Sequence, residues 1–209
     1  MQAAIGHAIH ETFEVGDKDV VGYTPIDLRK HYHIETGGNG SSIFSIPYAA
    51  ELDECDLGER ARRLRSEMDA QITPENIYAI VAFNCKRMVE RVLKAPYPIV
   101  VVAKTVTDRG RQIDAGHYTY GVSYPGKITF GDQIDQYVAS VTACAGSYSY
   151  PVWVMACETN GIVRMTITQD FESDALAKNI YDELSRALPG VTFEDQGYHE
   201  FDEFHLDEI

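Results

Sequence analysis

The stretch from Gly22 to Tyr48 constrains the fold most, because it contains two strand-like runs joined by a glycine-rich loop. The runs at residues 19–28 and 41–47 are rich in β-branched and apolar side chains, which favours strands. Residues 36–40 between them hold three glycines, which tolerate positive φ and close backbone approach. Asp27 and Arg29 lie two positions apart, so on a strand the carboxylate and the guanidinium would share one face and hydrogen-bond.

Four helices are predicted from apolar spacing and end signals. Ile5, Ile9 and Phe13 recur every fourth position, and Ser173 is placed to cap a helix near the end of the sequence. Thr73 and Pro74 mark the start of another helix, since Thr caps helices and Pro suits the first turn. The helices are expected at about residues 2–13, from Leu57 to Met68, from Pro74 to Val92 with a stripe of Ile77, Val81, Cys85, Met88 and Val92, and from 173 to about 188.

The second half of the sequence is mostly strand-like. The clearest hairpin runs from Val152 to Thr168, where Asn160-Gly161 is the favoured pair for a two-residue type I′ turn. Its alternation predicts that Val163, Met165 and Ile167 face the core. Further strands are expected at 118–124, 137–144 and 191–193, and the valine-rich run 99–103 is either a strand or the buried end of a helix. This order of elements predicts an α/β fold with two layers.

Composition indicates an ordinary globular protein of 209 residues, with 44% hydrophobic and 24% charged residues. The formal charge of −14 would repel a phosphate backbone, so nucleic acid is not expected as a partner. No apolar run approaches the roughly 20 residues that a membrane span requires, and no leader precedes the first helix, so we expect a cytoplasmic protein. We expect one domain over residues 1–193, followed by an acidic aromatic tail over 194–209.

That tail contains seven acidic residues and no Lys or Arg, with aromatic side chains between them. Such composition is typical of disorder, and the aromatics would otherwise dock on this domain, on another domain or on a neighbouring copy.

Histidine and cysteine positions give little support for a catalytic or metal site. The four cysteines show no zinc spacing, and Cys85, Cys144 and Cys157 lie in apolar segments where Cys acts as a small hydrophobe. We expect no metal. His31 and His33 are interpreted as surface or loop residues. His7 and His10 lie on the first predicted helix, and they would suit a metal only if carboxylates converged on them.

An arginine cluster at 60, 62, 63 and 65 is interpreted as the solvated face of its helix, with binding of coenzyme A phosphates as the alternative.

Three segments carry a resemblance to a known superfamily. Pro25, Asp27 and Arg29 match a P-x-[DN]-x-R strand, and Gly38-Asn39 match the Gly-Asn loop that follows it. Residues 120–127 are similar to a V-S-Y-x-G-K segment, and residues 165–174 to a segment that leads into a last helix. Over residues 1–193 the chain resembles the C-terminal half of proteins of the chloramphenicol acetyltransferase and condensation-domain superfamily, and most of all the bacterial alcohol O-acetyltransferases.

The resemblance implies a CoA-dependent acyltransferase-like lobe: a mixed, mostly antiparallel sheet of about six strands with helices on one face. Asp27 and Arg29 would hold the shape of the lobe. Gly38, Asn39, Ser41, Tyr124 and Gly126 would line a tunnel to the active centre. The donor would be an acyl thioester, acyl-CoA or an acylated carrier protein, and the acceptor an alcohol or amine, with no covalently bound cofactor.

The catalytic signature of that superfamily, His-His-x-x-x-Asp-Gly, does not occur in this sequence. Such an enzyme needs a histidine to deprotonate the acceptor. We therefore expect the chain to be inactive alone and to work with an N-terminal catalytic lobe or with a second copy of itself. The alternatives are a non-catalytic binding or scaffold module of the same fold, and a small trimeric acetyltransferase that uses His199, which Asp202 and Glu203 follow.

Overall fold

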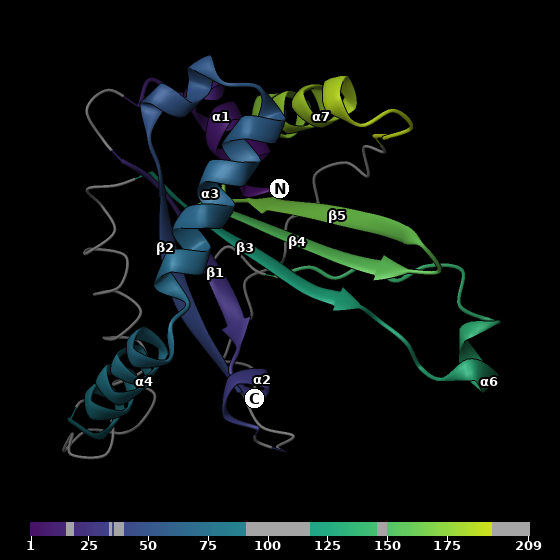
Figure 1. Ribbon diagram of the computed structural model, residues 1–209. Coiled ribbons are helices and arrows are strands. Elements are labelled where there is room, and N and C mark those ends of the chain that lie inside the picture. Colours follow the sequence, from purple (N-terminus) through teal and green to yellow (C-terminus); the bar gives the residue numbers. More distant parts are fainter. Residues whose placement is uncertain (16–18, 34, 36–39, 91–117, 146–149, 194–209) are drawn as a thin grey trace, which may run out of the picture.

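The computed structural model describes residues 1–209 except 16–18, 34, 36–39, 91–117, 146–149 and 194–209 (Figure 1). Within these residues the elements follow an α+β order. They are α1 (Gln2–Thr12), β1 (Val20–Asp27), α2 (Arg29–Tyr32), β2 (Ser41–Tyr48), the 3-10 helix η1 (Ala50–Glu54), α3 (Leu57–Gln71), α4 (Pro74–Met88), β3 (Tyr118–Lys127), α6 (Asp132–Asp135), β4 (Val152–Thr159), β5 (Ile162–Gln169) and α7 (Ala175–Ala187). No helix in the described ranges has both the length and the apolar character that a membrane crossing requires.

The five described strands form one mixed sheet in the order β2-β1-β3-β4-β5. The two outer pairs are antiparallel and the two inner pairs are parallel. The expected mixed sheet is confirmed for the described residues, with five strands in place of about six. The expected strand at 191–193 is absent, and the run at 99–103 lies outside the described residues.

The expected strand at 137–144 is also absent. Asn160 Nδ2 donates to the Val138 carbonyl at 2.7 Å, and Cys157 Sγ to the Val141 carbonyl at 3.3 Å. These two contacts hold the segment beside β4 and the hairpin turn, and it adds no strand to the sheet.

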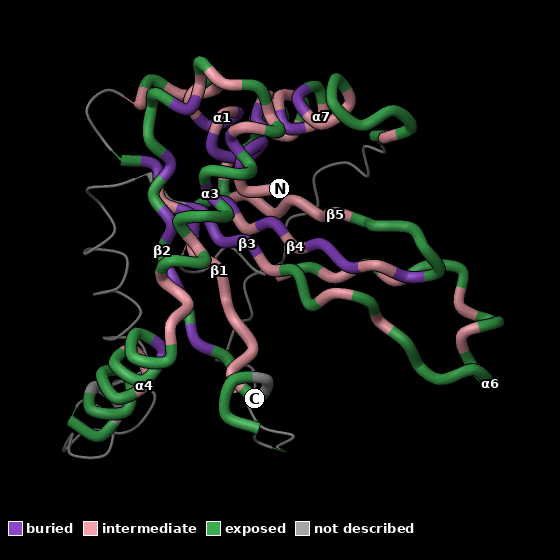
Figure 2. Tube along the Cα trace, in the orientation of Figure 1, coloured by how far each residue is buried: buried purple, intermediate pink, exposed green. Residues whose placement is uncertain are grey.

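The main core lies between one face of the sheet and the helices α1, α3 and α7 (Figures 1 and 2). Alternate strand residues such as Val20, Ile46 and Val154 are buried against α1. A buried ion pair joins α3 to α7, with Arg60 Nη1 and Glu183 Oε1 2.8 Å apart. The predicted arrangement of helices on one face is confirmed for these three helices, whereas α4 projects away from the sheet (Figure 1).

Local signals placed most helix ends correctly. Thr73 accepts a hydrogen bond from the Asn76 amide at 3.2 Å and caps α4, with Pro74 in the first turn. The last helix starts one residue later than expected, because Asp174 is its N-cap, although Ser173 Oγ still accepts from the Ala175 amide.

The predicted hairpin is present as β4 and β5. Asn160 and Gly161 have φ of 52° and 78°, as a type I′ turn requires. Met165 and Ile167 pack on the core as predicted, but Val163 is 59% exposed. The tip of the hairpin extends beyond the helices, so none of the described helices covers this end of β5 (Figure 1).

Candidate functional site

The sheet forks between β1 and β3. These strands are parallel, and they pair only between residues Val20–Tyr23 of β1 and residues Tyr118–Gly121 of β3. Beyond that point β1 follows β2 as far as Asp27, and β3 follows β4 to Lys127, so the two strands diverge (Figure 1). A crevice at the carboxyl ends of neighbouring parallel strands that part is a common place for ligand binding in α/β sheets.

Three stacked aromatic rings lie at the position where β1 and β3 stop pairing. Tyr150 stacks on Tyr23 at a centroid distance of 4.7 Å and on Trp153 at 5.6 Å. Tyr23 lies on the last paired position of β1, and Trp153 pairs with the residue opposite it on β3. The stack therefore bridges β1 and β4 at the level where the strands separate.

An open groove of about 840 Å³ occupies the fork. Its walls come from the start of α1, the end of β1, α2, the start of β2, α3 and the end of β3. The lining residues are Met1, Gln2, Ala3, Thr24, Pro25, Ile26, Asp27, Arg29, His31, Gly40, Ser41, Ala61, Leu64, Arg65, Met68, Val122, Ser123, Tyr124 and Pro125.

Asp27 and Arg29 form the expected ion pair, and both line the groove. Arg29 Nε donates to Asp27 Oδ1 at 2.8 Å, and the backbone amide of Arg29 donates to the same oxygen at 3.0 Å. The hydrogen bond with Asp27, and then its charge, raise the pKa of Arg29. The route to the contact differs from the prediction. Arg29 lies in the first turn of α2, so a turn brings the two groups together instead of a shared strand face.

The residues expected near the tunnel divide into three groups. Ser41 and Tyr124 line the groove, and Tyr124 is 51% exposed. Gly126 is not among the lining residues, although it adopts a φ of 89° just past the irregularity in the β3–β4 pairing. Gly38 and Asn39 lie outside the described residues, as does His199. Gly40, the next described residue, accepts a hydrogen bond at its carbonyl from the Leu28 amide at 2.7 Å.

His31 is the histidine that lines the groove, and it is exposed on α2. Within the described residues no carboxylate hydrogen-bonds its ring. It therefore lacks the orienting partner that a histidine base normally has.

A second cluster of polar groups joins α1 to η1. His7 Nδ1 lies 2.8 Å from Asp53 Oδ1, and His10 Nδ1 lies 2.5 Å from Asp53 Oδ2. Tyr48 donates its hydroxyl to Asp53 Oδ1 at 2.8 Å, and its ring meets that of His10 edge-on. None of these four residues lines the groove.

The charges of this cluster follow from its hydrogen bonds. Burial acts to raise the pKa of Asp53, but hydrogen bonds from His7, His10 and Tyr48 outweigh burial and lower it. Burial, followed by the hydrogen bond to Asp53, raises the pKa of Tyr48. Asp53 is thus an anion that accepts three hydrogen bonds, and Tyr48 stays protonated.

Sequence reasoning missed this cluster, because Asp53 lies more than 40 residues from both histidines along the chain. Although a carboxylate does converge on His7 and His10, the described part of the chain holds no group of three or more His, Cys, Asp or Glu placed to bind a metal. Of the cysteines expected to be buried, Cys157 is buried, while Cys85 and Cys144 are exposed.

Comparison of the chain with protein-family models, with curated proteins and with solved structures finds no match in any of the three.

Proposed function

We propose that this chain is the C-terminal lobe of an acyltransferase that moves an acyl group from a thioester to an alcohol or amine. One observation supports this more than any other. The P-x-D-x-R segment around Asp27 and the V-S-Y-P-G segment around Tyr124, almost 100 residues apart, form opposite arms of one fork with a groove between them. Both segments carry the resemblance to acyltransferases.

The reaction requires a general base, and the described residues that line the groove include no histidine with a carboxylate partner. The acceptor heteroatom forms a bond to the acyl carbon, the carbon–sulfur bond breaks, and the thiol leaves with a proton that the base took from the acceptor. His31 has no carboxylate partner among the described residues, and the pair His7 and His10 stands outside the groove. A catalytic lobe that carries the base, or a second copy of the chain, would complete the centre.

The proposal is tested in the full-length gene product with acetyl coenzyme A and simple alcohols. Ser123 lines the groove and is partly buried, so Ser123→Trp should narrow the groove and lower kcat/KM at least tenfold. Arg62→Ala is the matched control, because Arg62 is 75% exposed and does not line the groove. Equal kcat/KM in the Ser123→Trp and Arg62→Ala variants would show that the groove does not bind the substrates of the reaction.

The same assay distinguishes the alternative sources of the base. Loss of turnover in His199→Ala would indicate a self-sufficient oligomer that uses its own tail. Turnover that survives this change, but needs residues outside this chain, supports a separate catalytic lobe. Ligand binding with no turnover under any condition would indicate a scaffold module.

A further inference from the structure

The groove has an apolar interior contributed mainly by α3. Ala61, Leu64 and Met68 follow one stripe of that helix, and all three line the groove. Ile26 of β1 lines the groove from one arm of the fork and is half-buried, as is Met68, whereas Ala61 is exposed. Leu64 and Val122 lie beneath them in the main core. The groove therefore offers apolar contacts mainly at Ala61, Met68 and Ile26.

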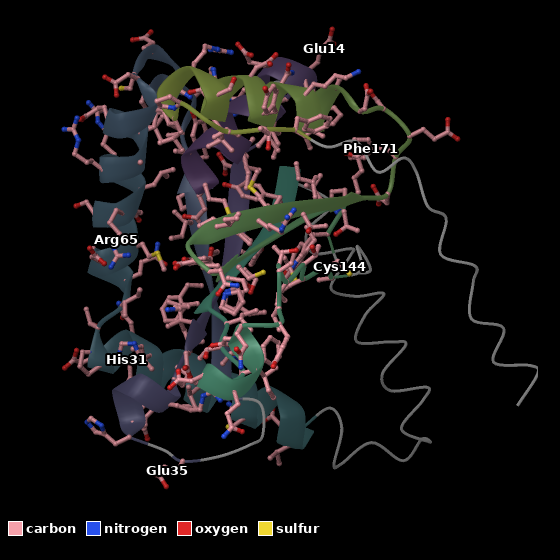
Figure 3. The ribbon with its side chains drawn as sticks, turned by 90° about the vertical axis from the view of Figure 1, so that its right-hand side faces the viewer. Glu14, His31, Glu35, Arg65, Cys144 and Phe171 are labelled. Atoms are coloured by element: carbon pink, nitrogen blue, oxygen red, sulfur yellow. The ribbon has the colours of Figure 1, made fainter. Side chains whose placement is uncertain are left out.

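The rim of the groove carries two arginines and one carboxylate. Arg29 and Arg65 line it, His31 lies there as well, and Figure 3 shows Arg65 and His31 on the same side of the molecule. Asp27 is the acidic residue that lines it, and the Arg29 guanidinium pairs with that carboxylate at 2.8 Å. Arg65 is 68% exposed and pairs with Asp69, which lies outside the groove. In a chain of formal charge −14, such a rim favours an anionic group.

We propose that the groove binds an unbranched aliphatic chain with an anionic head group, and that the chain lies along Ala61, Leu64 and Met68 while the head lies near Arg29 and Arg65. The volume of about 840 Å³ suits a small molecule of this kind. This inference rests on the proposed function, because it assigns the class of acyl group that the same groove holds.

The first test is a calorimetric titration of the complete chain with hexanoate, octanoate, decanoate and dodecanoate. Each further buried methylene should tighten binding about fourfold until the groove is filled, since burial of a CH₂ contributes ~0.8 kcal/mol. Decanoate should bind more tightly than decanol, because decanol lacks the negative charge. Affinity that does not depend on chain length, or decanol that binds as tightly as decanoate, overturns the inference.

Variants of α3 locate the binding site. Ala61 is exposed and lines the groove, so Ala61→Phe should obstruct the groove without disturbing the core and weaken decanoate binding at least tenfold. Arg65→Ala should weaken it about two- to fivefold, the range expected for an exposed charge pair. Arg62→Ala, on the same helix but outside the groove, should stay within twofold of the unmodified chain.

Thermal melting checks the fold of each variant, and Ala61→Leu replaces Ala61→Phe if that variant fails to fold. Unchanged affinity in the folded Ala61 variant, or equal losses in the Arg62 and Arg65 variants, overturns the inference.

Decanoyl coenzyme A distinguishes the two sources of the anionic head. Tighter binding of this thioester than of decanoate identifies an acyl donor, and the reverse identifies a free fatty acid; both support the anionic aliphatic ligand. Chain-length-dependent binding by a protein that transfers no acyl group would retain this inference and reject the proposed function. Acyl transfer with no chain-length dependence of binding would do the opposite.

Discussion

The two ends of the sheet differ in whether their side chains are bonded and packed within the fold or face an open groove. At the end where β2 meets α1 and η1, Asp53 accepts hydrogen bonds from two histidines and Tyr48, and the Tyr48 ring packs on α1. At the other end β1 and β3 separate, and the apolar side of α3 lies open above a groove with two arginines on its rim.

The difference separates a region whose side chains bond to one another from the region to which we assign ligand binding. Side chains at the closed end are occupied by one another, so a substitution there should mainly change the free energy of unfolding. At the open end Leu64 and Val122 belong to the core, but Ala61, Arg65 and Tyr124 are exposed. A substitution at one of these exposed positions should mainly change ligand affinity.

Glu183→Ala should destabilise the protein most, by about 3–5 kcal/mol, because it leaves the buried guanidinium of Arg60 without its carboxylate. Arg60 and Glu183 are only 5% and 4% exposed. Urea unfolding measures the change. Arg186→Ala is the control, since Arg186 contacts the same carboxylate at 3.1 Å from a side chain that is 64% exposed. If both variants lost a similar free energy of unfolding, the buried pair of Arg60 and Glu183 would contribute no more than the exposed contact of Arg186.

Gly6→Ala should destabilise the closed end by about 1–3 kcal/mol, the usual cost of overpacking. A Cβ at this position would lie 2.3 Å from Tyr48 Cδ2, so the Tyr48 ring would have to move away from α1. The hydrogen bond from Tyr48 to Asp53 would be lost as well. Unfolding at an unchanged urea concentration would indicate that α1 tolerates a wider spacing from β2, contrary to the packing described.

Asp53→Asn should cost about 1.5–2 kcal/mol near neutral pH, the lower end of the range for hydrogen bonds to a charged group, because the Asp53 side chain is 29% exposed. The pKa of Asp53 is lowered in the folded chain, so its contribution is fully present above the unfolded value of about 3.9 and is lost as the pH falls through the folded pKa. Urea midpoints from pH 6 to pH 2 should therefore fall less steeply in Asp53→Asn than in the unmodified chain. If the urea midpoints of the two proteins fell equally with pH, the folded protein would not stabilise the ionised form of Asp53, contrary to this prediction.

Arg29→Ala, at the open end, should have the smallest effect on stability, below about 1 kcal/mol, because the pair with Asp27 is largely exposed. Its effect on decanoate affinity should nevertheless exceed that of Asp53→Asn, which lies outside the groove. Calorimetry on the two variants under one set of conditions makes the comparison. If Arg29→Ala weakened decanoate binding less than Asp53→Asn does, the proposed division between a stabilising end and a binding end would be wrong.

Local patterns predicted the parts of the fold that depend on neighbouring residues. The Asn160-Gly161 turn, the Thr73 cap and the stripe of α3 that includes Leu64 were all predictable from short windows, because turn and helix preferences act over a few positions. The Asp27–Arg29 pair was also predictable from its spacing, although the turn that forms it was not.

Features that depend on distant contacts were not predictable. The fork arises from where β1 stops pairing with β3, and the sequence does not give that register. The β-rich run at 137–144 forms no strand, and two of its carbonyl groups accept hydrogen bonds from side chains of β4 and its turn. Of the stripe expected on α4, Ile77 is buried, Val81 is half-buried and Cys85 is exposed, and the helix projects from the body (Figure 1). Val92 lies outside the described residues. Asp53 could not be assigned to the histidines without the fold.

The most direct test of the central claim is acetyl transfer from acetyl coenzyme A to an alcohol, measured for this chain alone and for the full-length gene product. We predict turnover in the full-length protein and none in the isolated chain, because no described residue of the groove is an oriented base. Turnover by the isolated chain that disappears in His31→Ala or His10→Ala would show that the chain carries its own base, and would contradict the account.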